Sequence, residues 1–274
     1  MNILSLGLNL NTEYNTFHVF PDNTGDGSAR SSVGETNGTN QIFQSDTDFS
    51  GELETSDAVT VGMTVMFTNN TAGNNNYIIY NGGPSGTASN SSFRMSTHAV
   101  DGFKIYCDGS SAYVDKAFGG LDTSDIQNQD RWIRIIWGWD KDRDDGYITW
   151  AYDFVPEPET ATASSGGSAR AASTSEMATG GELICGGFQI SPGPGVIASE
   201  PMKWGNVVIW EDLLPASDMR EFMAGEDPAT INADGLIHYY DFNGDGEDYG
   251  DDSSGRVGDA DNTAINSASF TATP

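Results

Sequence analysis

Short runs of aromatic and β-branched residues recur along the chain, and clusters of Gly, Asn, Asp and Ser separate them. This pattern is typical of an all-β sandwich or barrel. Almost no segment with a period of 3.6 residues lies between the runs, which excludes a parallel α/β fold. The runs that we predict to be strands are residues 59–67, 77–80, 103–107, 131–139, 146–154, 181–190, 203–210 and 236–242.

The clearest pair of runs predicts an antiparallel hairpin, with a connection at 140–146 that is too polar to bury and ends in a glycine. Apolar and polar residues alternate along both runs, so one face of each strand is apolar, and Arg134 falls on the opposite face. We expect two sheets to bury their tryptophans against each other. The apolar face consists of Ile133, Ile135, Trp137 and Trp139 in the first run and Ile148, Trp150, Tyr152 and Phe154 in the second.

One segment, near 215–224, is predicted to be a short helix. Pro215 and Ser217 mark its start, and acidic residues fall where the positive end of the helix dipole favours them. Gly225 supplies the stop. The apolar stripe of this helix consists of Met219, Phe222 and Met223.

The 274 residues fit a single domain, 1–274, because one core stops growing at roughly 250–300 residues. Lys and Arg number 12 against 40 Asp and Glu, a formal net charge of -28. Phosphate backbones and anionic lipids repel such a chain, which excludes nucleic-acid and membrane partners. The amino terminus has no signal-peptide pattern and no apolar run approaches the ~18 residues of a membrane span, so we expect synthesis in a cytoplasm without secretion.

Segments at about 22–40 and 156–181 are rich in small polar residues. The second contains too few large apolar residues to offset the entropy of ordering it. We predict long exposed loops there, or arms that order only against a neighbouring subunit. The two cysteines, Cys107 and Cys185, lie far apart in apolar runs and are expected to be buried thiols rather than a disulfide.

The last quarter of the chain carries a sequence of features that is similar to the pattern of a known family. A strand ending in Trp at 207–210 precedes a short helix at 214–225, an Asp-Pro turn at 227–228, a strand at 236–242 and an Asp-Ser-Ser-Gly turn at 252–255. This order resembles the laminin-G-like branch of the concanavalin A-like lectin/glucanase superfamily. The resemblance implies a jelly-roll sandwich of two antiparallel sheets.

Two further runs, 101–109 and 130–140, resemble the middle strands of that family. The Asp-Ser-Ser-Gly strand commonly opens the domain in the family, whereas here it closes the chain. That arrangement resembles virion-associated proteins of tailed phages, especially marine ones. The resemblance therefore implies a structural protein of a virion.

Glycoside hydrolysis is the first enzyme activity to consider for a protein with this fold. It needs two carboxylates about 5–5.5 Å apart for retention, or further apart for inversion. The glucanases of the superfamily place them as Glu-x-Asp-x-x-Glu on one strand, and no predicted strand contains this run. Alternating acids at 52–54 and 157–159 fall outside the strands, and the three histidines are isolated. We therefore predict no catalytic residues and no enzyme activity.

Calcium binding is favoured over glycoside hydrolysis. Residues 241–246 reproduce the first half of the D-x-[DN]-x-[DN]-G calcium loop, and an acid occupies its twelfth position. In that calcium site a helix precedes the loop, whereas here a strand does. The twelfth ligand is normally Glu, and Asp is shorter by one methylene. An ordinary acidic turn is therefore the alternative. The predicted metal ligands are Asp241, Asn243, Asp245 and Asp252.

The hairpin connection offers a second, weaker acidic cluster. It contains Asp140, Asp142, Asp144 and Asp145, but Lys141 and Arg143 already compensate much of that charge.

Our main functional prediction is a non-enzymatic decoration or cement protein on the outer capsid surface of a tailed phage. Its partners would be the major capsid protein and further copies of the chain, with a trimer suited to local threefold axes. It would assemble in the host cytoplasm and reside on the virion surface.

The first alternative is a carbohydrate-binding, lectin-like module, and a glycoside hydrolase is the least favoured. An Asn-rich stretch at 69–77 and the pair Tyr239 and Tyr240 offer the acceptors and aromatic faces that bind sugars. Aromatic residues at alternating strand positions are, however, more often part of a core.

Overall fold

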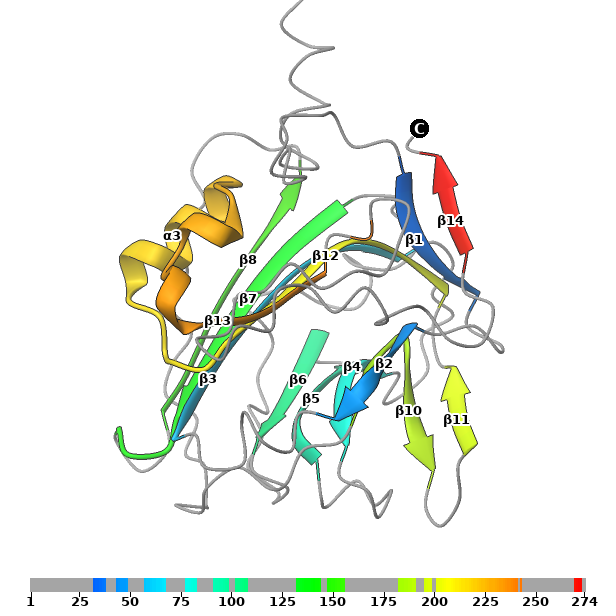
Figure 1. Cartoon of the computed structure of the whole chain (residues 1–274), viewed down its shortest axis with the longest axis horizontal. Helices are drawn as coiled ribbons and strands as arrows, with labels where there is room; N and C mark the ends of the chain where they lie inside the picture. Colours follow the sequence, from blue (N-terminus) through cyan, green and yellow to red (C-terminus); the bar gives the residue numbers. More distant parts are fainter. Residues whose placement is uncertain are drawn as a thin grey trace, which may run out of the picture.

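The described part of the chain forms a sandwich of two antiparallel sheets with an α-helix on its outside (Figure 1). This agrees with the predicted all-β, jelly-roll-like fold. The computed structural model describes residues 32–37, 43–48, 57–67, 77–82, 91–98, 102–107, 132–143, 147–155, 182–190, 195–198, 201–240, 242 and 269–272.

The larger sheet has seven strands in the order β14-β1-β12-β3-β7-β8, with β13 also paired to β12. Strands β1 and β13 share one edge of β12, because β1 pairs with residues 201–204 and β13 with residues 207–210. The strands are β1 (Ser32–Asn37), β3 (Ala58–Phe67), β7 (Trp132–Asp140), β8 (Tyr147–Val155), β12 (Pro201–Trp210), β13 (Leu236–Tyr240) and β14 (Ser269–Ala272).

The smaller sheet has five strands in the order β2-β9-β4-β5-β6, and β10 and β11 form a separate two-stranded ribbon. Gly186 joins β9 to β10 at a φ of +81°, a conformation that favours glycine. The strands are β2 (Phe43–Asp48), β4 (Tyr77–Gly82), β5 (Ser91–His98), β6 (Gly102–Cys107), β9 (Glu182–Cys185), β10 (Gly187–Ile190) and β11 (Gly195–Ala198).

The core between the sheets contains the apolar face predicted for the β7–β8 hairpin as far as Tyr152, and the side chain of Phe154 lies outside the described residues. Trp137 lies opposite Trp150 in the strand register, and both are buried. From the other sheet, Phe93 packs edge-on against Trp137 with ring centroids 5.6 Å apart. The alternation along β7 is therefore confirmed. Cys185 is also in this core as a free thiol, as predicted, and burial raises its pKa.

Helix α3 (Ala216–Ala224) packs on part of the outer face of the larger sheet, which confirms the predicted helix (Figure 1). Phe222 packs edge-on against Trp210 and directly over Gly62, where a Cβ would lie 2.7 Å from the ring. The helix ends at Gly225, whose φ is +88°. Two short 3-10 helices, η2 (Pro228–Thr230) and η3 (Ala233–Gly235), connect it to β13.

Arg134 lies on the helix-facing side of β7, as the alternation predicts, and only 4% of it is exposed. Its Nη1 donates a hydrogen bond of 2.7 Å to the carbonyl oxygen of Met223 in the last turn of α3. The helix has no basic residue of its own in that turn. A strand residue therefore supplies the cation that stabilises the negative end of the helix dipole.

The structure corrects part of the predicted arm at 22–40. Residues 32–37 form β1, which lies between β12 and β14, and Thr36 is buried. The indole Nε1 of Trp204 on β12 donates to the Thr36 hydroxyl at 3.4 Å. Backbone pairing with β12 and β14 thus places this segment in the larger sheet. The segment at 156–181 and the side chain of Cys107 lie outside the described residues.

No helix in the described part of the chain is long and apolar enough to cross a membrane.

Candidate functional site

The predicted calcium ligands Asp241, Asn243, Asp245 and Asp252 lie outside the described residues. The structure does describe Phe242, within the same loop. Its ring is 2% exposed and packs on Phe43, with centroids 4.6 Å apart, although its φ of +53° is unusual for a bulky residue. The beginning of the loop is therefore anchored in the core, and the metal site stays a prediction.

We expect calcium to bind this loop and to raise the melting temperature of the protein. At a calcium concentration of 100 times Kd, the stabilisation would be about 2.7 kcal/mol. Calorimetric titration and thermal melts measure both effects. Asp245→Ala should abolish them, whereas Asp234→Ala, which changes an exposed acid in η3, should not. Absence of both heat and a melting shift at millimolar calcium would contradict the prediction.

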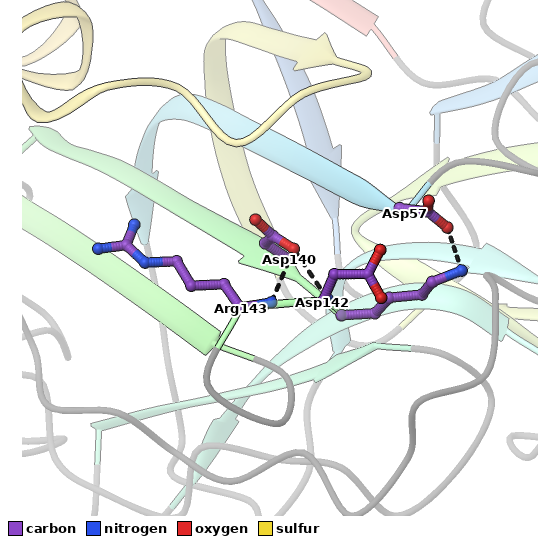
Figure 2. Close-up of polar contacts among 5 residues, drawn as sticks. Asp57, Asp140, Asp142 and Arg143 are labelled. Atoms are coloured by element: carbon purple, nitrogen blue, oxygen red, sulfur yellow. Dashed lines mark hydrogen bonds and ion pairs between the residues drawn. The ribbon is translucent and has the colours of Figure 1, made fainter.

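The second acidic cluster lies in the connection of the β7–β8 hairpin. Its first carboxylate, that of Asp140, holds a turn (Figure 2). One oxygen of Asp140 accepts the backbone N–H groups of Asp142, at 2.9 Å, and Arg143, at 3.2 Å. Lys141 forms an ion pair with Asp57 at the start of β3. Asp144 and Asp145 lie outside the described residues. Among those described, no three His, Cys, Asp or Glu residues converge as metal ligands would.

The aromatic pair considered for sugar stacking belongs to the protein interior, so this part of the lectin hypothesis is wrong. Tyr239 is 0% exposed and packs with the residues under α3. Tyr240 is 4% exposed and packs in the core between the sheets, stacked with Phe242 and His238. Residues 69–76 of the Asn-rich stretch lie outside the described part of the chain.

The smaller sheet carries a row of residues that extends across all five strands on the face directed away from the core. Its neighbouring row, Phe43, Cys185, Ile79, Met95 and Ile105, is buried in the core. Side chains alternate between faces along a strand, so the next row belongs to the outer face. The residues that occupy this outer row in register are Gln44, Ile184, Tyr80, Arg94 and Tyr106.

Arg94 occupies a central position in this outer row, between Tyr80 on β4 and Tyr106 on β6. The side chain of Arg94 is half-buried. Ile184 in the same row and Ser96, two residues further along β5, are almost completely buried. A guanidinium offers five donors in a planar fork. The outer row therefore places a half-buried guanidinium between two aromatic positions of the neighbouring strands.

Arg94 is not among the residues predicted for a site, because the predicted strands do not include residues 91–98. A signal was nevertheless present: Phe93 and Met95 alternate with Arg94 and Ser96, and the first two are buried in the core.

No family model matches this chain, and no curated protein matches it. Solved structures do show similarity. A candidate carbohydrate binding protein from Bacteroides ovatus ATCC 8483 superimposes with a TM-score of 0.50 at 15% identity, covering 89% of this chain and 60% of that one. The carbohydrate-binding module CBM40 of a Ruminococcus gnavus IT-sialidase, bound to alpha2,3 sialyllactose, gives a TM-score of 0.37 at 9% identity, covering 68% and 95%.

This chain thus spans 60% of the length of the Bacteroides protein. At such low identity, the similarity to that protein shows a shared β-sandwich fold.

Proposed function

We propose that this chain is a non-catalytic carbohydrate-binding module that binds glycans on the outer face of its smaller sheet. The observation that carries the proposal is the row in which Arg94 lies between Tyr80 and Tyr106. The shared fold with the Bacteroides protein, itself described as a candidate carbohydrate binding protein, supports the proposal by analogy.

The chemistry of the row suits a sugar. Aromatic rings present large apolar faces that suit the C–H face of a pyranose, and guanidinium N–H groups donate to its hydroxyl oxygens. The net charge of -28 opposes the approach of polyanionic glycans. We therefore favour neutral oligosaccharides as ligands.

The non-catalytic part of the proposal is supported by what the described carboxylates do. Asp140 holds a turn, and Asp227 accepts the backbone N–H of Ala229 at the start of η2. Asp218 accepts a hydrogen bond from Ser217 in the first turn of α3. Two of these carboxylates accept backbone N–H groups, and the third accepts a neighbouring hydroxyl.

We expect the full-length protein to bind neutral oligosaccharides on a glycan array, and Arg94→Ala to weaken binding about tenfold or more. Hydrogen bonds to charged groups contribute about 1.5–3 kcal/mol, and 1.4 kcal/mol is a tenfold change in Kd. The matched control is Arg220→Ala, which removes an equal charge from the exposed side of α3.

Calorimetry with the best glycan measures the two Kd values, and melting temperatures verify that both variants fold. An array without any bound glycan would contradict the proposed function. Equal affinity in the two variants would instead show that the outer row is not the binding site.

The role on a virion surface, with the major capsid protein and further copies of the chain as partners, stays a prediction from the resemblance of the terminal segment. Mass spectrometry of purified phage particles tests it directly: the chain must be a component of the particle.

A further inference from the structure

A row of buried polar side chains crosses the outer face of the larger sheet near the end of α3. Asn206 on β12 pairs in register with Thr64 on β3, which in turn pairs with Arg134 on β7. Their exposed fractions are 2%, 0% and 4%. Met63 and Val65, which flank Thr64, are in the core between the sheets, so this row faces the other side.

Two atoms of this row lack hydrogen bonds. Within the described part of the chain, neither Thr64 Oγ1 nor Asn206 Oδ1 has a partner, and both are inaccessible to solvent. Directly opposite residues in an antiparallel pair have Cβ atoms about 4.5–5.5 Å apart. The two groups therefore share one small space. Buried polar groups nearly always find a partner, so a pair of exceptions in one place requires a physical account.

A β-bulge lies beside the pair. The register between β12 and β3 shifts between Trp204 and Asn206, which places the buried Gly205 outside the regular ladder. A bulge leaves the extra residue without a cross-strand partner and redirects the following side chain. Gly205 thus adds backbone polar groups beside Asn206.

The chemistry of the row determines which occupant fits. Asn206 Oδ1 only accepts hydrogen bonds, which disfavours an anion there. Arg134 lies next in the row and carries a positive charge, which disfavours a cation. A hydroxyl oxygen both donates and accepts, and the burial of the row requires a small molecule. Water satisfies these conditions.

We propose that Thr64, Asn206 and the bulge at Gly205 bind one internal water molecule. The water donates to Asn206 Oδ1 and exchanges a hydrogen bond with Thr64 Oγ1. Because Arg134 in the same row holds the carbonyl oxygen of Met223, the water completes a polar layer that connects β12 and β3 with the end of α3. This site is independent of the proposed glycan-binding row on the smaller sheet.

The pair of variants Thr64→Val and Asn206→Leu tests the proposal through their coupling. Each single change leaves the other polar group without its bridge, and we expect each to lower the melting temperature by roughly 2–4 °C or more. The double variant removes both polar groups and should recover much of that loss.

The matched control is Thr60→Val, on the same face of β3. The Thr60 hydroxyl donates to the carbonyl oxygen of Asp212 and accepts from the N–H of Leu214, so Asn206→Leu should not rescue this change. Additive losses for Thr64→Val and Asn206→Leu would overturn the proposal.

Two further measurements identify the occupant without relying on stability. Oxygen-17 relaxation dispersion counts long-lived internal waters, and the wild-type protein should contain one more than the double variant. A high-resolution crystal structure of the full chain should show an ordered oxygen within hydrogen-bond distance of Thr64 Oγ1 and Asn206 Oδ1. Equal water counts, or a direct hydrogen bond between the two side chains, would overturn the proposal.

Discussion

Replacing Phe222 by alanine should lower the free energy of unfolding by about 3–5 kcal/mol. The ring is 1% exposed and belongs to the cluster between α3 and the larger sheet. It packs edge-on against Trp210, with centroids 5.9 Å apart and an interplanar angle of 86°. Its removal would leave a cavity and detach the only α-helix in the described part of the chain from its support. Urea denaturation followed by tryptophan fluorescence measures the loss.

Glu221→Ala is the matched control, because this neighbour lies exposed on the same helix and should change stability by no more than about 0.5 kcal/mol. A companion variant tests the contact itself. Gly62→Ala would place a Cβ 2.7 Å from the Phe222 ring and should cost about 1–3 kcal/mol. In the background of Phe222→Leu that cost should fall. A loss below 1 kcal/mol for Phe222→Ala would show that α3 is not held by this ring.

The hairpin and the helix are predictable from sequence because their information is local. Alternation along β7 assigns Trp137 to the core and Arg134 to the opposite face, and both assignments hold. The apolar stripe of α3 and Gly225 likewise define the helix within nine residues. Neither element requires knowledge of its distant partners.

Several strands are not predictable in this way, because pairing rather than composition determines them. Strand β1 consists of the residues SVGETN and is held between β12 and β14, which come from the other end of the sequence. The outer row around Arg94 has the same origin. Its members come from five strands, and only the register brings them together.

Burial also explains why the Tyr239 and Tyr240 pair was a misleading candidate. Aromatic residues at consecutive strand positions point to opposite faces, and here both faces of β13 are covered. One residue packs under α3 and the other between the sheets. The proposed glycan-binding row lies instead on the smaller sheet, whereas α3 packs on the larger one.

Replacing Trp137 by alanine should cost about 3–5 kcal/mol, whereas Trp137→Phe should cost much less, about 1–2 kcal/mol. The side chain is 0% exposed and packs edge-on against Phe93 of the other sheet, a contact that a phenylalanine can retain in part. Within the described residues, the indole Nε1 of Trp137 donates no hydrogen bond. The substitution by phenylalanine therefore leaves no acceptor unpaired.

Trp210→Phe provides the comparison that isolates the contribution of a hydrogen bond from the indole N–H. The indole Nε1 of Trp210 donates to the carbonyl oxygen of Ile231 at 2.8 Å, and that oxygen would lose its partner inside the protein. The same change in side-chain size should therefore cost about 1–3 kcal/mol more at 210 than at 137. Urea denaturation of both variants measures the difference. Equal costs at the two positions would show that Trp137 has a polar partner and that the core between the sheets is not purely apolar at this point.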